Sequence, residues 1–211
     1  MDSIEYVVYA TNISTGCESP TARKIEILDN IVDPVFEIRT SKSICLRSED
    51  GSTNLFNGTA NIVFEENNTI QEITWTGPNG TVVEGDRSLS NAEPGMWSVT
   101  FVPENGCDYT QEFEIDASMK VYNGISANGD GRNDYMIIDC VDYFPNNTVT
   151  VYNRDGSLVY EADGYNNIDV RFDGTSNVGR SSKQLPVGTY FYFIDKNDGS
   201  EKMQGYLELV R

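Results

Sequence analysis

The stretch NGISANGDGRNDYMII, residues 123–138, crowds oxygen-bearing side chains and three glycines between two apolar runs. Carboxylate and amide oxygens are calcium ligands, and an EF-hand-like loop needs an oxygen ligand at its fifth position and glycine at its sixth. Counting from Asn128, the fifth residue is Arg132 and the sixth is Asn133, and neither fits. If calcium binds here, the expected ligands are Asn128, Asp130 and Asp134.

Backbone geometry is the other interpretation of this stretch. The pairs Asn128-Gly129 and Asp130-Gly131 suit a turn with positive φ, where Asn and Asp side chains cap neighbouring amides. We therefore expect a structural turn and no cofactor, with calcium kept as the alternative.

Enzymatic chemistry finds little support in the residue types. The chain contains no His, which excludes Ser-His-Asp and Cys-His catalysis and His-bearing zinc sites. A glycosidase needs two carboxylates roughly 5–10 Å apart, and no pattern places two acids at that distance. Trp75 and Trp97 would suit a sugar-binding platform, but both lie in strand-like runs, so we interpret them as core residues of a β-sandwich. We expect the protein not to be an enzyme.

Composition and charge narrow the class of protein. Aromatics make up 11% of the 211 residues, and Asn-Gly and Asp-Gly pairs separate runs rich in Thr, Val and Ile, which favours an all-β fold. The net charge of -18 disfavours nucleic acid as a partner. The net charge of residues 1–117 is -14 and that of residues 118–211 is -4. We therefore expect the two parts to face different surroundings.

The sequence shows neither a membrane-spanning helix nor an N-terminal signal peptide. No apolar run approaches the ~20 residues of a spanning helix. The first residues, MDSIEYVVYATN, lack the basic start and apolar core of a signal peptide. They read as a strand, as though the sequence were cut from a longer one with an export signal in front.

One sequence pattern occurs three times, at residues 5–19, 94–108 and 186–200. Each copy has an aromatic-rich strand with alternating side chains, followed by a polar turn that contains Gly. The spacing of about 90 residues is the size of an immunoglobulin-like β-sandwich. The sequence therefore predicts tandem immunoglobulin-like, Greek-key modules: closing strands of a truncated module at 1–32, a complete module at 33–117 and a last module at 118–211. Strands are predicted at 36–40, 60–64, 70–76, 97–102, 111–115, 135–138, 148–153, 158–162, 190–195 and 203–210.

The cysteines suggest one disulfide. Cys45 lies early and Cys107 late in the middle module, so a Cys45–Cys107 bridge would tie its opening strand to its closing hairpin. Cys17 holds the place of Cys107 in the first copy, with its partner expected outside this sequence. Cys140 follows an apolar run and is interpreted as a small buried hydrophobe. A disulfide would indicate an oxidising compartment.

The last module carries a family resemblance. VYNGISANGDGRNDYMII, FPNNTVTVYNRDGSLVYEADGYNN, FDGTSN, LPVGTYFYFI and GYLELVR occur in this order over most of residues 120–211. They resemble the gliding motility-associated C-terminal domain, the type B sorting domain of the type IX secretion system. Asp155 and Phe172 stand where the family often has Trp. In the middle module, ITWTGPNG and AEPGMWSVTFVPENGC are similar to repeats of large surface adhesins of the SprB type.

The resemblance implies a function and a partner. Such a domain is a sorting signal, recognised by the translocon and often by a dedicated PorP/SprF-like protein of the outer membrane. The protein would be a gliding or surface adhesin, exported through the periplasm to the cell surface. The alternative is a carbohydrate-binding module with the export tail of a secreted polysaccharide-degrading enzyme.

The C-terminal strand and one turn supply candidate contact residues. In MQGYLELVR, Tyr206 alternates with Leu207 and Leu209, and the strand ends at Arg211. Because the strand runs to the end of the sequence, we expect the signal to be a folded domain. We also expect these residues to contact the partner or to shape the strand that does, and a strand at a sheet edge would also offer β-augmentation. Arg154 would contact a partner or serve a hairpin turn at Asp155-Gly156.

Overall fold

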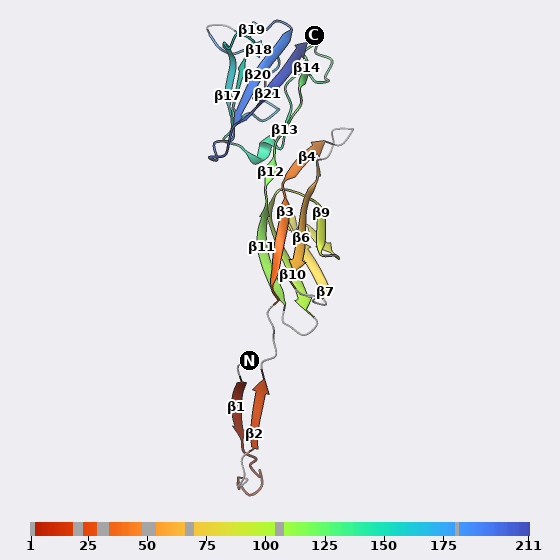
Figure 1. The fold of residues 1–211 in the computed structure, drawn as a ribbon, viewed down its shortest axis with the longest axis vertical. Coiled ribbons are helices and arrows are strands. Elements are labelled where there is room, and N and C mark those ends of the chain that lie inside the picture. Colours follow the sequence, from red (N-terminus) through yellow and green to blue (C-terminus); the bar gives the residue numbers. More distant parts are fainter. Residues whose placement is uncertain are drawn as a thin grey trace.

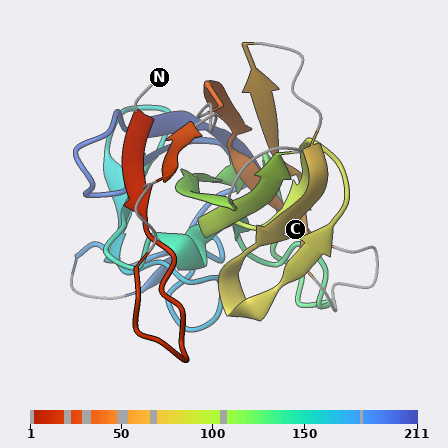
Figure 2. The ribbon, with the colours of Figure 1, turned by 90° about the horizontal axis from the view of Figure 1, so that it is seen from below.

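The computed structural model describes residues 3–18, 23–28, 34–47, 54–65, 70–103, 108–179 and 182–211. Their regular structure consists of strands and two 3-10 turns, η1 (Pro78–Gly80) and η2 (Val141–Tyr143), which confirms the all-β prediction. No helix in this part of the chain has the length and apolarity needed to cross a membrane. A hairpin and two modules follow one another along the long axis (Figure 1), and they overlap when seen along it (Figure 2).

Each copy of the threefold sequence pattern forms an antiparallel hairpin. The first pairs β1 (Ser3–Val8) with β2 (Arg23–Leu28), the second β10 (Gly95–Pro103) with β11 (Tyr109–Ile115), and the third β20 (Gly188–Asp195) with β21 (Met203–Val210). The repeat is therefore a structural one, and the module boundaries at 32/33 and 117/118 stay a prediction.

The middle module packs two antiparallel sheets face to face. One sheet has the order β3-β6-β9, formed by Phe36–Ser41, Gly58–Phe64 and Ser88–Ala92. The other has the order β11-β10-β7-β8, in which β7 spans Ile70–Thr76 and β8 spans Val82–Glu84. This strand order resembles that of immunoglobulin-type sandwiches.

The core of the middle module follows from the alternation along its strands. In β10, Trp97, Val99 and Phe101 point inward and are buried, since successive side chains face opposite sides of a sheet. Trp75 of β7 is fully buried, and its indole N–H donates to Asp86 O at 3.1 Å, while that of Trp97 donates to Glu93 O at 2.9 Å. Both tryptophans are therefore core residues, as predicted, and neither offers a sugar-binding platform.

The last module is built on one five-stranded sheet of order β14-β21-β20-β16-β17. In it β14 (Gly124–Ser126) runs parallel to β21, and β16 (Thr148–Tyr152) and β17 (Leu158–Asp163) form the antiparallel hairpin next to β20. Two short ladders complete the module, β13 (Lys120–Val121) with β15 (Ile138–Asp139), and β18 (Thr175–Ser176) with β19 (Lys183–Gln184).

Within the part of the chain that the structure describes, one face of this sheet is covered and the other is not. Val149, Val151, Ile194, Leu207 and Leu209 share one buried core with side chains from the loops and short strands, which form the second layer: Met119, Met136, Ile138, Val141, Tyr165, Phe172 and Leu185. The predicted strand at 135–138 is wrong except at its last residue, because Met136 donates its N–H to Phe172 O of a loop, at 2.8 Å, rather than to a strand.

The two modules meet at a shared strand pair. β12 (Ala117–Ser118) continues from β11 and pairs in parallel with β4 (Ser43–Arg47), which also pairs with β5 (Asn54–Phe56). Next to this ladder the buried Cys45 of β4 is bonded to the buried Cys140, with 5.1 Å between the two Cα atoms. The disulfide thus joins the middle module to the last one.

The predicted Cys45–Cys107 bridge is therefore wrong. That prediction assumed that β4 closes a self-contained module, whereas β4 lies at the junction and its cysteine faces the last module. Cys107 lies outside the described residues. Cys140 is buried, as predicted, but it is a disulfide partner rather than a small hydrophobe. Cys17 is exposed and free.

Non-reducing peptide mapping should recover Cys45 joined to Cys140. The bridge closes a loop across 95 residues, for which the chain-entropy model gives roughly 4–5 kcal/mol. Cys45→Ser and Cys140→Ser should therefore lower the free energy of unfolding equally, by up to that amount, whereas Cys17→Ser should leave it unchanged. Recovery of Cys45 joined to Cys107 would contradict the assignment.

Candidate functional site

The loop between β14 and β15, residues 127–137, is called the signature loop and is shaped by its own backbone. Gly129 and Gly131 have φ of 78° and 83°, and Asn133 has φ of 53°. These are left-handed conformations, which Gly adopts freely and Asn tolerates. The N–H of Ser126 donates to Asn133 O at 2.7 Å and closes the loop at its base.

The acidic groups of this loop accept hydrogen bonds from within it. The two carboxylate oxygens of Asp134 accept from the backbone N–H groups of Gly129 and Gly131, each at 2.7 Å. Asp130 accepts from the N–H of Arg132 at 2.8 Å and from the side-chain amide of Asn128 at 3.1 Å. Both hydrogen bonds lower the pKa of the Asp130 carboxyl, and the bond from the N–H of Arg132 has the larger effect.

This geometry supports the turn interpretation of Asn128, Asp130 and Asp134. The carboxylate oxygens face amide donors instead of converging on one point, as ligands of a cation do. Among the described residues, no group of three or more His, Cys, Asp or Glu is placed to hold a metal ion. Calcium binding stays an untested alternative.

A buried tyrosine ties the loop to the second layer. The Tyr165 hydroxyl donates to Met136 O and accepts from the N–H of Phe172 at 3.0 Å, which joins two segments 36 residues apart. Burial raises the pKa of the Tyr165 phenol, so it stays protonated and able to donate. Phe172, at a position where Trp is common in the family, is fully buried in the core. Sequence reasoning missed Tyr165, which no local pattern distinguishes from the other tyrosines.

The C-terminal strand is divided between core and surface. The side chains of Leu207 and Leu209 are 0% exposed. Tyr206 points to the opposite side of the sheet, and its side chain is 50% exposed. We predicted two alternative roles for these leucines. Their burial prevents direct contact with a partner in the folded domain, so the structure allows only the other role, which is to shape the strand. Arg211 donates to Leu185 O at 2.6 Å and to Gly174 O at 3.4 Å, so it fastens the strand end to a loop.

The end of the strand lies inside its sheet, so the expectation of an edge open to β-augmentation is wrong for Glu208–Val210. β21 pairs with β20 along its length on one side and with β14 through Glu208–Val210 on the other. The sheet edges are β14 and β17. At β17 the Asn177 side chain pairs with the backbone of Glu161, accepting from its N–H at 3.0 Å and donating to its carbonyl at 2.8 Å.

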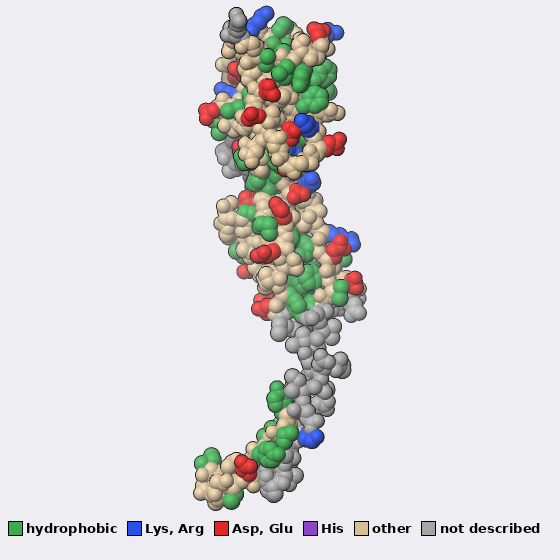
Figure 3. Space-filling view, turned by 90° about the vertical axis from the view of Figure 1, so that its left-hand side faces the viewer, with side chains coloured by type: hydrophobic (Ala, Val, Ile, Leu, Met, Phe, Trp, Pro, Cys, Tyr) green, Lys and Arg blue, Asp and Glu red, His purple; other side chains and the backbone are tan. Residues whose placement is uncertain are grey.

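The uncovered face of the five-stranded sheet carries aromatic side chains. We call it the open face, defined by Tyr152, Phe191, Phe193 and Tyr206. Phe191 lies opposite Tyr152 on β16 and opposite Tyr206 on β21, and the rings of Tyr152 and Phe193 meet edge to face at 5.7 Å. Over three of these rings lies a hollow of about 850 Å³. Hydrophobic atoms gather on this module at the upper right of Figure 3.

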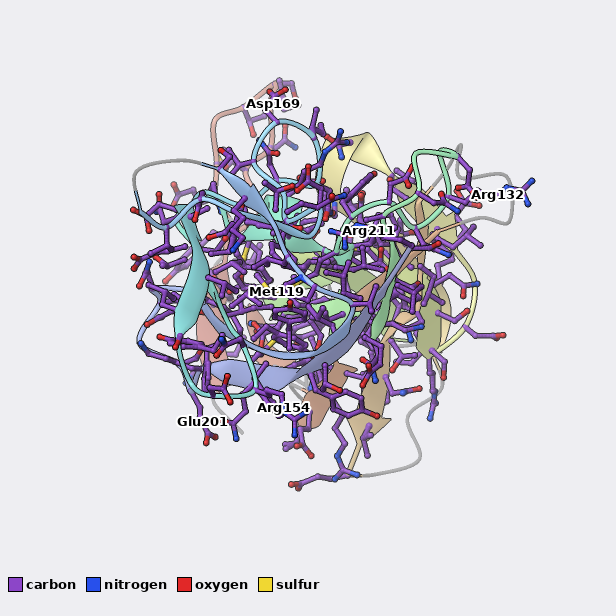
Figure 4. All side chains as sticks on the ribbon, turned by 90° about the horizontal axis from the view of Figure 1, so that it is seen from above. Met119, Arg132, Arg154, Asp169, Glu201 and Arg211 are labelled. Carbon is purple, nitrogen blue, oxygen red and sulfur yellow. A yellow bond between two sulfur atoms is a disulfide. The ribbon has the colours of Figure 1, made fainter. Side chains whose placement is uncertain are left out.

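Charged groups border the hollow. Lys202 forms an ion pair with Asp195 at 2.8 Å, and its hydrogen bond lowers the pKa of Asp195 and raises that of Lys202. Arg154, in the β16–β17 turn, lines the hollow and is exposed. Figure 4 shows Arg154 well separated from Arg132 of the signature loop. Arg154 thus lies both in the hairpin turn and at the hollow. From there it could support the turn or contact a partner, the two roles that we predicted for it.

Replacing Asp134 by Ala should destabilise the last module whether or not calcium is present. The change leaves two backbone N–H groups without their charged acceptor, and such bonds contribute roughly 1–3 kcal/mol. Thermal unfolding with chelator and with millimolar calcium measures it, with Asp169→Ala in an exposed loop as the control for lost charge. A loss of stability seen only with calcium would contradict the turn interpretation.

Tyr165→Phe should cost roughly 1–3 kcal/mol of stability, because it leaves the carbonyl of Met136 and the N–H of Phe172 without their partner in the core. Tyr206→Phe removes the same hydroxyl from an exposed position and should change stability by less than about 0.5 kcal/mol. Chemical denaturation compares the two. Equal effects would show that the Tyr165 bridge contributes nothing.

Comparison with known proteins finds a family match for the last module. Residues 119–209 match the family described as the CHU_C type IX secretion signal domain. No curated protein matches the chain. Among solved structures, the chain is similar to a "Biofilm associated protein - BSP domain", with 13% identity and a TM-score of 0.26 over 81% of this chain and 29% of that one.

The family match covers the five-stranded sheet, the signature loop and the second layer together. It agrees with the resemblance seen in the sequence motifs. Residues 119–209 therefore form a type IX secretion signal domain of the CHU_C family.

Proposed function

We propose that this chain is the C-terminal region of a surface adhesin that takes part in gliding motility. In this proposal the last module is the signal for export, and the modules before it form part of a stalk. The observation that carries the proposal is the match of residues 119–209 to a type IX secretion signal domain. Export by this system leads to the cell surface.

The stalk part of the proposal is supported by the middle module. It is a two-sheet sandwich that follows the first hairpin and precedes the signal domain along one axis (Figure 1). The burial of Trp75 and Trp97 removes the aromatic platform on which the alternative, a carbohydrate-binding module of a polysaccharide-degrading enzyme, depended. With an all-β fold and a secretion signal domain, a binding role is favoured over a catalytic one.

The proposed partners are the type IX translocon and a PorP/SprF-like protein of the outer membrane. These partners would recognise the last module as a folded domain. The core residues of its terminal strand, Leu207 and Leu209, are inaccessible in the native state. The Cys45–Cys140 disulfide supports passage through an oxidising compartment, which the periplasm provides. The mature protein would remain associated with the outer membrane.

The test is a secreted reporter fused to residues 1–211 and carrying a signal for entry into the periplasm. We expect it at the cell surface when the PorP/SprF-like protein is present, and in the periplasm when that protein is deleted. A matched fusion lacking residues 118–211 should stay periplasmic in both strains. If the truncated fusion reached the surface at the full level, the last module would not be the export signal.

A further inference from the structure

The open face is an aromatic surface that the described residues leave uncovered. Phe191 is 44%, Phe193 38% and Tyr206 50% exposed. They lie in one continuous patch, because Tyr152, Phe191 and Tyr206 are neighbours across three adjacent strands and Phe193 touches Tyr152. The other face of the same sheet is closed by Tyr165, Phe172 and the loops around them.

Such a patch is costly to leave in water and typical of a contact surface. Contiguous apolar patches rimmed by polar groups mark interaction sites, and aromatic and Arg side chains dominate the binding energy of protein interfaces. The hollow over the rings, about 850 Å³, gives a partner's side chains somewhere to insert. At its rim, Arg154 makes no hydrogen bond or ion pair with any residue that the structure describes.

The charges indicate the chemistry of the occupant. Lys202 is already paired with Asp195, which leaves the guanidinium of Arg154 and the carboxylate of Glu161 as the other charged groups that line the hollow. A complementary protein surface therefore supplies apolar side chains to the rings, a carboxylate to Arg154 and a hydrogen-bond donor to Glu161. The net charge of -18 works against an anionic lipid surface as the occupant.

We propose that the open face is the surface by which the last module docks on its protein receptor at the outer membrane. The proposal rests on the proposed function, since it places the receptor of the export signal on a particular side of the domain. It assigns contact roles to Phe191, Phe193, Tyr206 and Arg154, and a positioning role to the buried leucines of β21.

The first experiment compares export of the reporter fused to residues 1–211. Phe191→Ser with Phe193→Ser should lower the amount at the surface roughly tenfold or more, while thermal unfolding shows the domain still folded. The control pair is Ile168→Ser with Val178→Ser, two exposed apolar residues in the loops after β17. Arg154→Glu should lower export severalfold, whereas Arg132→Glu in the signature loop should not.

The outcomes separate the two proposals. If the folded open-face variants are exported like the parent, and the parent still requires the PorP/SprF-like protein, the docking surface is wrong and the proposed function stands. If the parent itself does not need residues 118–211 for export, the proposed function fails.

A second experiment does not depend on substitutions that weaken folding. A photo-crosslinking amino acid in place of Phe193 should join the chain to the PorP/SprF-like protein in cells, and one in place of Ile168 should not. Crosslinking from position 193 only to a second copy of this chain would identify a dimer surface and overturn the proposal. Absence of any crosslink to the PorP/SprF-like protein, at normal export, would overturn it as well.

Discussion

The last module depends on the position of β21 between β20 and β14. This one strand pairs on both sides, places Leu207 and Leu209 at the centre of the core, and presents Tyr206 on the opposite face. Because its side chains alternate between core and surface, the strand cannot leave the sheet without exposing the core and dismantling the open face. In the native state the strand therefore presents a folded surface, in which Leu207 and Leu209 are inaccessible.

The junction places a second constraint on the molecule. β12 leaves the middle module, pairs with β4 of that module, and leads within two residues to β13 of the signal domain. The Cys45–Cys140 disulfide closes the same region covalently. The middle module and the signal domain are thus held together at their contact, so that the orientation of the open face is set with respect to the module before it.

The elements with strong local patterns could be predicted from the sequence, and those fixed by distant contacts could not. β7 and β21 begin and end at the predicted residues, and both carry a local alternation of inward apolar side chains, at Ile73 and Trp75 in β7 and at Leu207 and Leu209 in β21. β14 has three residues and no such pattern, yet its parallel pairing places the end of β21, Glu208–Val210, inside the sheet. The pairing of Cys45 with Cys140 depends on how two modules meet, and the bridging role of Tyr165 on a carbonyl and an amide from separate loops.

The most direct test measures, for one set of variants, the surface yield of the reporter fused to residues 1–211 and the fraction of folded protein. The set is Leu207→Ala, Leu209→Ala and Leu209→Asp, all of which alter the core and leave the side chains of the open face unchanged. Export is predicted to fall in step with the folded fraction and to be lost in Leu209→Asp, where a charge is placed in the core. An unfolded Leu209→Asp protein that reached the cell surface at the parental level would contradict a folded signal.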